Sequence, residues 1–339
     1  MKKYGFGIVG CGAIADVHAA VIGELSNGTL VGVYDKAHPR SAAFAEKQGC
    51  RSYATYEEML ADEAVEVVCI CTPSGLHAPL ILDAVKAGKH FIVEKPMAIT
   101  EEQIDAIQTE VKQAHVKGAV ISQYRFVDGI QILKKAVADG LLGKIILGDI
   151  YMKYNRSEDY YASSGWRGTW AMDGGGALMN QGIHGVDAMQ YILGPVRAIS
   201  GVCRTLLHDI EVEDTAVFSV EYESGAIGTI QGTTSVTPGY PRRIEISGTK
   251  GTVILVEGEI VSWDVKDVPK PEMQAQAKND SFNNPISFSI EHHKIQFEDL
   301  LSAIENDREP LVNVDEGSRA VKIILSAYRA SKEGKRITL

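Results

Sequence analysis

The sequence predicts an α/β protein in which a doubly wound parallel sheet is followed by a second α/β region with a mainly antiparallel sheet. Short apolar runs alternate with amphipathic stretches in the first third of the chain, whereas strand-like segments follow one another without helices between residues 196 and 264. The length of 339 residues favours two domains over one. We expect one domain at 1–124 and the other at 125–339. An alternative left open is that the final helices pack back on the first domain.

Continuous apolar strands in the first domain are typical of a parallel sheet covered on both faces. Strands are expected at 4–10, 30–35, 65–73 and 90–96, and helices at 13–25, 39–49 and 76–89. Another helix should begin at Thr100, because Thr100 and Gln103 have the spacing of a capping box. Cys69 and Cys71 alternate along one apolar run, so they should share one face of a buried strand.

The second domain is expected to be rich in strands. Helices are expected at 128–139, 287–306 and 315–332, and strands at 144–154, 196–205, 215–222, 226–236, 242–248 and 252–256. Residues 155–176 are polar and glycine-rich, and residues 266–285 have the composition of a loop.

Composition excludes several classes of protein. The formal net charge of −10 argues against a nucleic-acid or anionic-membrane partner. The five cysteines are scattered without a CxxC pair, which indicates reduced thiols in a cytosolic protein and no metal site. Glycines interrupt the apolar run near the N-terminus, unlike a signal peptide, and no stretch approaches a membrane span in length. A soluble cytoplasmic protein is therefore expected.

The segment GIVGCGAIAD predicts a dinucleotide site. It contains Gly10-x-Gly12-x-x-Ala15 between a strand and a helix. Gly10 permits the tight turn, Gly12 lets the backbone approach a pyrophosphate, and Ala15 lets the helix pack on the strand. The helix start at Ala13 and Ile14 offers free N–H groups to the phosphates. The alternative is an ordinary glycine turn without a ligand.

An acidic residue at the end of the second strand bears on the choice of cofactor. Asp35 can hydrogen-bond both ribose hydroxyls and would repel a 2′-phosphate, which favours NAD over NADP. The basic residues Lys36 and Arg40 lie nearby in the sequence, so NADP remains an alternative cofactor. The alternative is a surface aspartate.

The segment CTPSGLHAPL follows a third predicted strand, at the carboxyl end where ligands bind in such sheets. Residues expected to contact the cofactor here are Thr72, Pro73, Ser74 and His77. His77 could equally be only a helix-start residue.

The chain also carries VEKP at 93–96 and GGGALMNQGIHGVD at 174–187. With the N-terminal fingerprint, HHKIQFEDLLSAIENDREPLV and the ending AYRASKEGKRITL, these segments resemble the glucose–fructose oxidoreductase and inositol dehydrogenase (Gfo/Idh/MocA) family over nearly the whole chain. The ordered set is specific for the family and poorly specific for the substrate.

The resemblance implies a Rossmann domain followed by a domain with a large open sheet. The exposed face of that sheet makes the oligomer contact in relatives, so a homodimer or homotetramer is implied. The resemblance further implies an NAD(P)-dependent oxidoreductase that transfers hydride between nicotinamide and a hydroxyl or ketone of a sugar, sugar derivative or cyclitol.

The EKP lysine of the family corresponds to Lys95, which follows Glu94. The resemblance implies that Lys95 hydrogen-bonds the reacting hydroxyl and that both residues lie on the nicotinamide side. The family also places Asp-x-x-x-His on a helix; His184 matches the histidine, but Asn180 stands at the aspartate position. Positions i and i+4 share a helix face, so both can point at one substrate.

Asn180 leaves the identity of the principal base open, because an amide supplies no charge to an imidazolium. Either His184 is a weaker base helped by another acid, or Lys95 takes the larger share of proton transfer. Asp187 could be that acid, although a structural hydrogen bond is favoured for it. The glycines at 174–176 are expected to let the helix start lie against the cofactor or the substrate.

SQYRF at 122–126 and GWRGTW at 165–170 are expected to complete the cleft. Gln123 is expected to bind the cofactor, and the residues expected to bind the substrate are Tyr124, Arg125, Trp166, Arg167, Asn180 and His184. The arginines could hold a carboxylate or a phosphate, and Trp166 or Trp170 could stack on a sugar ring. Packing between the domains would explain them equally well.

Two other functions remain open at this stage. An NAD-dependent glycosidase would oxidise its sugar transiently and show no net NADH production. A non-catalytic dinucleotide-binding sensor would bind NAD without turnover, and Asn180 is the feature that favours it.

Overall fold

The computed structural model describes residues 2–273 and 290–339, which form two compact units. Unit 1 contains the described residues of 1–121 and 288–318, and unit 2 contains those of 122–287 and 319–339. The boundary expected at residue 124 lies close to the end of the first segment. Part of the loop expected at 266–285 and the start of the helix expected at 287–306 lie outside the described residues.

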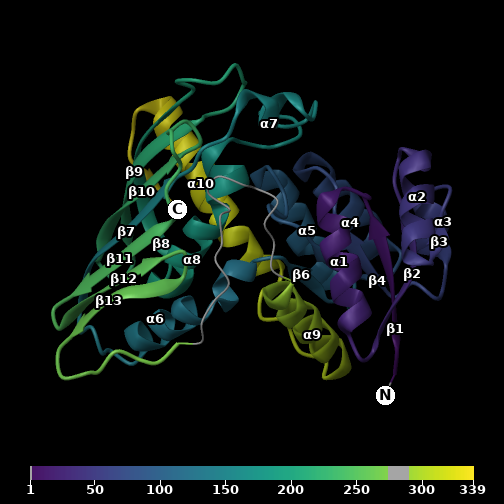
Figure 1. Cartoon of the computed structure of the whole chain (residues 1–339), viewed down its shortest axis with the longest axis horizontal. Helices are drawn as coiled ribbons and strands as arrows, with labels where there is room; N and C mark the ends of the chain where they lie inside the picture. The colour runs from purple at the N-terminus through teal and green to yellow at the C-terminus, as the bar shows by residue number, and fades with distance from the viewer. Residues whose placement is uncertain (1, 274–289) are drawn as a thin grey trace. The chain divides into compact units, whose positions relative to one another are not determined.

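Unit 1 is built on a parallel six-stranded sheet with the strand order β3-β2-β1-β4-β5-β6 (Figure 1). Its strands are β1 (Tyr4–Val9), β2 (Gly28–Tyr34), β3 (Arg51–Ser52), β4 (Val67–Ile70), β5 (His90–Val93) and β6 (Gly118–Val120). Its helices are α1 (Ala13–Glu24), α2 (His38–Gln48), α3 (Tyr56–Ala61), α4 (His77–Lys86), α5 (Glu101–Gln113) and α9 (Glu291–Glu305), with the short turn η1 (Ser74–Leu76). This strand order confirms the predicted Rossmann fold.

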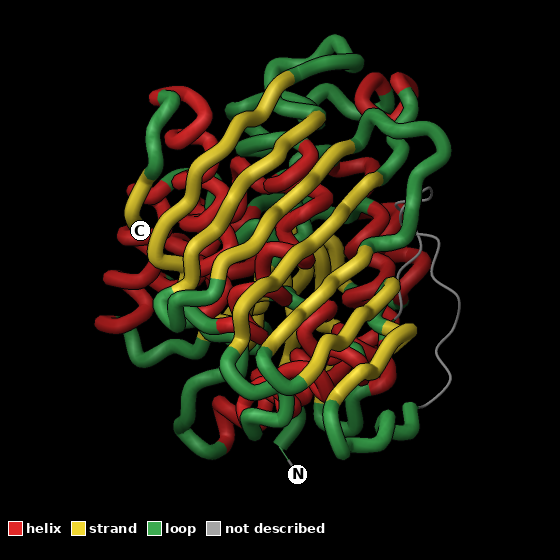
Figure 2. The backbone as a smooth tube through the Cα atoms, turned by 90° about the vertical axis from the view of Figure 1, so that its left-hand side faces the viewer, coloured by secondary structure: helices red, strands yellow, loops and turns green. Residues whose placement is uncertain are grey.

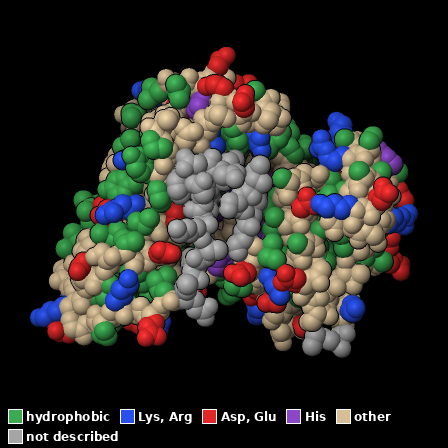
Figure 3. Space-filling model, viewed as in Figure 1, with side chains coloured by type: hydrophobic (Ala, Val, Ile, Leu, Met, Phe, Trp, Pro, Cys, Tyr) green, Lys and Arg blue, Asp and Glu red, His purple; other side chains and the backbone are tan. Residues whose placement is uncertain are grey.

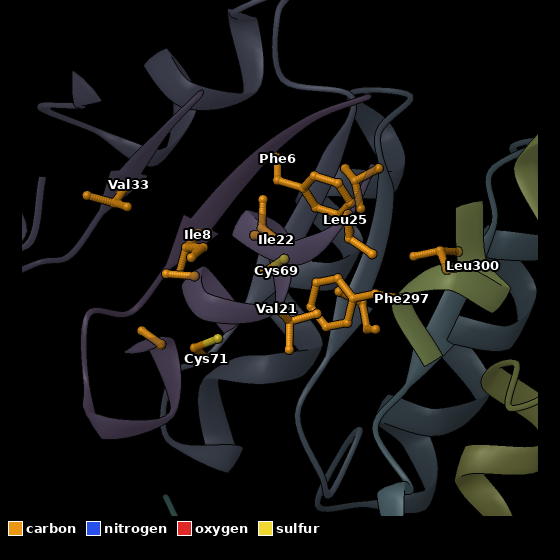
Figure 4. Packing of buried hydrophobic residues seen from close by; sticks show 14 of the residues in the cluster. Phe6, Ile8, Val21, Ile22, Leu25, Val33, Cys69, Cys71, Phe297 and Leu300 are labelled. Carbon is orange, nitrogen blue, oxygen red and sulfur yellow. The ribbon is translucent and has the colours of Figure 1, made fainter. Parts of the chain in front are cut away.

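Helices α1 and α9 pack against each other over one face of this sheet. Phe6 on β1 and Phe297 on α9 lie with ring centroids 5.8 Å apart in this layer (Figure 4). Cys69 and Cys71 belong to the same cluster, which confirms that they share one face. At about 25 cal/mol per Å² of apolar surface, burial of Phe297 contributes a few kcal/mol and holds α9 to the sheet.

Unit 2 contains an eight-stranded sheet with the order β13-β12-β11-β7-β10-β9-β8-β14, in which only the β7–β10 pair is parallel among the described strands. Its strands are β7 (Ile145–Lys153), β8 (Val196–Arg204), β9 (Thr215–Tyr222), β10 (Ile227–Thr233), β11 (Arg243–Gly248), β12 (Gly251–Val256), β13 (Glu259–Val265) and β14 (Ile337–Thr338). Its helical segments are η2 (Gln123–Phe126), α6 (Asp128–Ala138), α7 (Glu158–Ala162), the π-helical turn η3 (Ala177–Gly182), α8 (Ile183–Leu193) and most of α10 (Val314–Glu333).

One face of this sheet is covered and the other is open. Buried and accessible residues alternate along β9 and β10, as a sheet with one covered face requires. Helix α8 packs against β7, where Gly185 leaves room for Ile150 and Met152. Figure 2 shows the strands of the open face in front of the helices. The mainly antiparallel open sheet is therefore confirmed.

Several expectations about boundaries were wrong. The strands expected to reach residues 73 and 96 end at Ile70 and Val93, because the prolines that follow cannot donate to a sheet ladder. The sequence reasoning missed the short elements β3, α3, α7 and β14 and did not separate β13 from its neighbours. The capping box at Thr100 is confirmed, since Thr100 Oγ1 accepts from Gln103 N and Gln103 Oε1 accepts from Ile99 N.

No helix in the described part of the chain is long and apolar enough to cross a membrane.

Candidate active site

The predicted residues of unit 1 follow the carboxyl ends of its strands. Gly10 follows β1, Asp35 follows β2, the segment starting at Thr72 follows β4, and Lys95 follows β5. Strands β1 and β4 are neighbours, and the order of the sheet reverses between them. In doubly wound sheets, ligands bind at the carboxyl edge where this reversal occurs. The topology therefore brings these segments to one edge of unit 1.

The glycine loop leaves space for a ligand. Gly10 has φ +89°, and a Cβ there would lie 2.9 Å from the carbonyl carbon of Cys71, so only glycine fits. A Cβ on Gly12 would meet nothing within 4 Å, so the surface beside Gly12 is open. Ala15 is fully buried, as expected for close packing of the helix on the strand. The loop therefore offers the beginning of α1 to an approaching group.

Asp35 is held beside this loop by two backbone donors. Its Oδ2 accepts from Cys11 N at 2.9 Å, and its Oδ1 accepts from Ala37 N at 2.8 Å. Arg40 lies 3.6 Å from Oδ2, but its side chain is 61 % exposed, so solvent screens this pair. The carboxylate is thus oriented before any ligand arrives.

The segment after β4 contains a buried hydroxyl without a hydrogen-bond partner in the described structure, Thr72 Oγ1. Ser74, two residues further along the chain, is also buried. An orphaned polar atom in a buried position is costly unless a ligand satisfies it. Together with the space at Gly12 and the oriented Asp35, this hydroxyl shows that unit 1 fits a dinucleotide.

His77 is placed differently from a ligand-contacting side chain. It is 1 % exposed, with Nδ1 2.7 Å from the carbonyl oxygen of Pro96 and Nε2 2.8 Å from that of Thr72. Burial lowers the pKa of His77, and the two carbonyls partly oppose this effect. Both ring nitrogens therefore face backbone atoms, and His77 connects the segment after β4 to the segment after β5.

Glu94 supports Lys95 from within the core of unit 1. Its Oε1 lies 3.0 Å from Nε2 of His18 and 3.6 Å from Nε2 of His293, and its Oε2 accepts from Lys95 N at 3.3 Å. Burial opposes ionisation, but the hydrogen bond with His18 and the nearby imidazole of His293 outweigh it and hold the pKa of Glu94 well below its usual range. Sequence reasoning assigned no role to His18 and placed either His292 or His293 in the cleft, whereas His293 is buried beside Glu94. The signal in the sequence is that His18 and His293 are polar residues on apolar helix faces.

Lys95 is half-buried, whereas its neighbours Glu94 and Pro96 are buried. The backbone around Lys95 is therefore fixed from both sides while its side chain reaches the surface of unit 1.

In unit 2 the predicted residues lie on one continuous helical segment formed by η3 and α8. His184 is half-buried, whereas every other residue from 182 to 190 is buried. Asn180 and Gln181 are also half-buried, so the accessible positions are spaced by one helical turn. A π-helical turn inside a helix occurs frequently at functional sites. Asn180 and His184 therefore share the accessible face of this segment.

The amide of Asn180 belongs to a polar network. Its Nδ2 donates to Oδ1 of Asp173 at 2.5 Å, and its Oδ1 accepts from Nε2 of Gln181 at 2.9 Å. Arg156 Nη2 donates to Oε1 of Gln181 at 2.6 Å. Position 180 lacks the carboxylate of the family motif, but its amide is hydrogen-bonded to the carboxylate of Asp173. The sequence did not point to Asp173, because this residue lies outside the expected motif.

Arg125 is engaged in a buried ion pair and was expected to bind the substrate. Its Nε and Nη2 donate to the two oxygens of Asp187 at 2.7 and 2.6 Å, and its guanidinium lies 4.9 Å from the ring centroid of Tyr191. Since both oxygens of Asp187 are occupied, the geometry agrees with a structural role for Asp187. Breaking such a buried pair costs about 3–5 kcal/mol.

The remaining predicted residues are partly committed to packing. Tyr124 is buried under the guanidinium of Arg242 at 3.9 Å, while Oε1 of Gln123 and the hydroxyl of Tyr124 are buried without a partner in the described structure. Arg167 donates to Tyr160 O and lies against the rings of Tyr160 and Trp166. Trp166 is half-buried. These contacts are compatible with binding but do not require it.

The glycine run at 174–176 lies against protein. A Cβ on Gly176 would be 1.8 Å from the carbonyl oxygen of Glu213, and one on Gly175 would be 2.2 Å from the hydroxyl of Tyr328. The close approach at Gly175 and Gly176 is therefore to protein, whereas the sequence predicted an approach to the cofactor or the substrate. They make room for two residues of unit 2 itself.

In the described residues, no group of three or more histidine, cysteine or carboxylate side chains could hold a metal ion.

Known proteins match both parts of the chain. A family model described as an oxidoreductase family with an NAD-binding Rossmann fold matches residues 4–122, and one described as a GFO/IDH/MocA C-terminal domain matches residues 130–254. Myo-inositol 2-dehydrogenase of Thermotoga maritima is 26 % identical, with 98 % of each chain covered.

Solved structures match the whole chain. The WlbA dehydrogenase of Bordetella pertussis in complex with NADH and UDP-GlcNAcA is 30 % identical, with a TM-score of 0.90 over 100 % of this chain and 98 % of that one. Aldose-aldose oxidoreductase of Caulobacter crescentus is 27 % identical, with a TM-score of 0.85 over 100 % of both chains.

Proposed function

The chain belongs to the GFO/IDH/MocA family of NAD-binding oxidoreductases, and we propose that it exchanges hydride between NAD and a secondary hydroxyl or ketone of a sugar, sugar derivative or cyclitol. One observation in particular supports this proposal: in each unit, the predicted catalytic basic residue is half-buried within a run of buried residues. These residues are Lys95 in the run 91–99 and His184 in the run 182–190.

NAD, when bound, supplies the hydride acceptor through its nicotinamide ring. In unit 1, the backbone at Gly12 and the N-terminus of α1 would hold the pyrophosphate, and Asp35 would accept hydrogen bonds from the ribose hydroxyls. The Thr72 hydroxyl would gain the partner that it lacks within the described protein. Lys95 would donate a hydrogen bond to the reacting oxygen of the substrate and so orient the carbon that gives up hydride.

We assign removal of the hydroxyl proton to His184. A histidine can accept a proton near neutral pH, whereas a lysine ammonium donates hydrogen bonds. Asn180 would hydrogen-bond the substrate or the imidazole, and its connection to Asp173 would keep its amide in one orientation. Ketone reduction would use the same groups in reverse.

The substrate class follows from the surroundings of Asn180 and from the relatives. Arg156 and Arg167 lie near Tyr160, at 5.7 and 4.3 Å from its ring centroid. Guanidinium groups recognise carboxylates and phosphates. Since the similar WlbA structure contains UDP-GlcNAcA, an acidic or phosphorylated sugar should be tested together with neutral cyclitols.

The test is a panel assay with purified protein and NAD. The panel comprises myo-inositol, levoglucosan, glucose 6-phosphate, UDP-GlcNAcA and an aryl glycoside, and both NADH absorbance and released aglycone are recorded. NADH formation that is lost in Lys95→Met and in His184→Ala, but retained in the exposed control Lys86→Met, supports the proposal. Aglycone release without net NADH would indicate the glycosidase instead, and tight NAD binding without either signal would contradict dehydrogenase activity on these substrates.

We propose NAD rather than NADP as the working cofactor because Asp35 is fixed as a negative charge beside the glycine loop. In Asp35→Ser the Kd for NAD should rise about tenfold while that for NADP falls, since a repulsive charge and an acceptor are removed together. Fluorescence titration with NADH and NADPH measures both. Equal changes for the two cofactors would contradict the assignment.

We also propose that the open face of the eight-stranded sheet forms a homodimer or homotetramer contact. Exposed apolar side chains pair across neighbouring strands on this face: Val202 with Val217, and Leu147 with Ile227. Figure 3 shows the sheet from its side, with hydrophobic side chains among charged ones along the left-hand edge of the molecule. Val217→Glu should convert the oligomer to a smaller species in light-scattering measurements, because it buries a charge in the contact.

A further inference from the structure

Glu213 lies in the loop between β8 and β9 and is 3 % exposed. It accepts hydrogen bonds from three consecutive backbone N–H groups at the start of η3. Gly176 N donates to Oε2 at 2.9 Å, Ala177 N donates to the main-chain oxygen at 2.9 Å, and Leu178 N donates to Oε1 at 2.8 Å.

These three N–H groups belong to the first turn of a helical segment, where no partner exists within the helix. A Ser, Thr, Asp or Asn immediately before the helix usually provides such a partner. Here the residue at that position is Gly176, which has no side chain, and the cap comes from a residue 37 positions later. A carboxylate at this end of a helix is also favoured by the helix dipole.

Tyr328 on α10 completes the arrangement by donating its hydroxyl hydrogen to Oε1 of Glu213 at 2.9 Å. The glycine run is shaped for these two residues. A Cβ on Gly175 would collide with the Tyr328 hydroxyl, and one on Gly176 would collide with the Glu213 carbonyl. Trp170 packs against Tyr328 in a T-shaped arrangement, with ring centroids 5.3 Å apart. Three segments distant in sequence, at 170–178, Glu213 and Tyr328, thus meet at the start of η3.

We propose that Glu213 is a positioning residue for the reaction: together with Tyr328, it fixes the start of the helical segment that carries Asn180 and His184. Asn180 N already donates to Gly176 O, so Asn180 lies within the first turn that Glu213 holds, and His184 follows one turn later. A displacement of this turn would move both side chains together. This inference rests on the proposed role of His184.

The first test measures amide hydrogen exchange in the NADH-bound protein and needs no substrate. In Glu213→Gln an amide group replaces one acceptor with a donor, so peptides covering 174–184 should exchange faster than in the wild type. Tyr328→Phe keeps all three backbone bonds and should show a smaller increase. Glu223→Gln makes the same chemical change at an exposed position and should show none. Unchanged exchange in Glu213→Gln would overturn the proposal.

The second test uses the panel compound with the largest kcat/KM. Glu213→Gln should lower kcat about tenfold to a hundredfold, because a displaced catalytic group costs rate, with KM changed less than about threefold. The Kd for NADH should not change, because the glycine loop lies in unit 1. An intact kcat with faster exchange would overturn the positioning role. If no compound is turned over by the wild type but exchange responds, the proposed function has failed and the capping role stands.

Discussion

Each unit contains one buried glutamate that supports a half-buried basic residue, but the two glutamates are held by different partners. Glu94 lies between the imidazole rings of His18 and His293, and their contacts hold its pKa well below its usual range. Glu213 faces two backbone N–H groups and the Tyr328 hydroxyl, which are neutral, and burial raises its pKa to about 7. The pKa of a buried carboxylate therefore depends on the groups that face it, not on burial alone.

The two supports also differ in their distance along the chain. Lys95 is fixed by its neighbour Glu94 and by His77, which reaches Pro96 from 19 residues earlier. The start of η3 is fixed by Glu213 and by Tyr328, which lies on a helix near the C-terminus. The groups that touch the backbone around Lys95 are therefore close to it in sequence, although Glu94 in turn depends on His18 and His293, whereas the groups that hold the start of η3 are themselves distant in sequence.

The largest effect is expected from adding a methyl group where unit 2 has no room. Gly176→Ala would place Cβ 1.8 Å from the Glu213 carbonyl oxygen, so the first turn of η3 must move. We expect a loss of about 3 kcal/mol or more in the free energy of unfolding, as for overpacked sites, with loss of activity. Urea denaturation measures it. Gly165→Ala, where a Cβ meets nothing within 4 Å, should lie within about 0.5 kcal/mol of the wild type.

The two glutamates should give opposite pH dependence of stability. A raised pKa in the folded state makes stability highest below the ordinary glutamate pKa and lowers it as pH rises through the folded value. For Glu213 the stability of the wild type relative to Glu213→Gln should therefore fall by up to about 3 kcal/mol between pH 5 and pH 8. Tyr328 and Cys203, which face Glu213, have raised pKa values and remain uncharged in this range.

For Glu94 the sign is reversed, because its folded pKa is depressed. The contribution of Glu94 is present above the ordinary glutamate pKa and decreases as pH falls through and below that range. The stability of the wild type relative to Glu94→Gln should therefore rise as the pH increases from about 3 to about 5, below the range in which histidines ordinarily titrate. Denaturation curves at a series of pH values test both glutamates, and parallel curves for the two variants would contradict the distinction.

His77 should act on both the cofactor and the lysine, because it connects the segments after β4 and β5. His77→Asn is too short to span the two carbonyls and would lose the hydrogen bond that the ring donates to one of them, at a cost of about 1–3 kcal/mol. We expect the Kd for NADH to rise several-fold in fluorescence titration, with a lower Tm. The exposed His38→Asn serves as control. An unchanged Kd with a lowered Tm would restrict His77 to stability.

Much of the fold could be predicted from sequence because its signals are local. Apolar runs identified the strands of unit 1, and the glycine fingerprint identified the nucleotide edge. The helical segment carrying Asn180 and His184 was also located. The supports were not: Glu213, Tyr328 and Asp173 act through tertiary contacts that no periodicity encodes. The glycine run was assigned to a ligand for the same reason. A run of glycines indicates that another group lies close to the backbone, but the sequence does not show whether that group is a ligand or, as at Gly175 and Gly176, another part of the protein.

The smallest effect is expected where the chain departs from the family pattern at Asn180. Asn180→Asp restores the aspartate but places it 2.5 Å from Oδ1 of Asp173, where two carboxylates cannot both be ionised. We therefore expect kcat to fall several-fold, although the substitution recreates the common motif. In the double variant Asn180→Asp with Asp173→Asn, one carboxylate and one amide exchange places, and kcat should recover. Steady-state kinetics of the two single variants and the double variant measure the coupling. Higher activity in Asn180→Asp alone would show that Asp173 does not constrain position 180, and that the network around Asn180 is not what distinguishes this chain from its relatives.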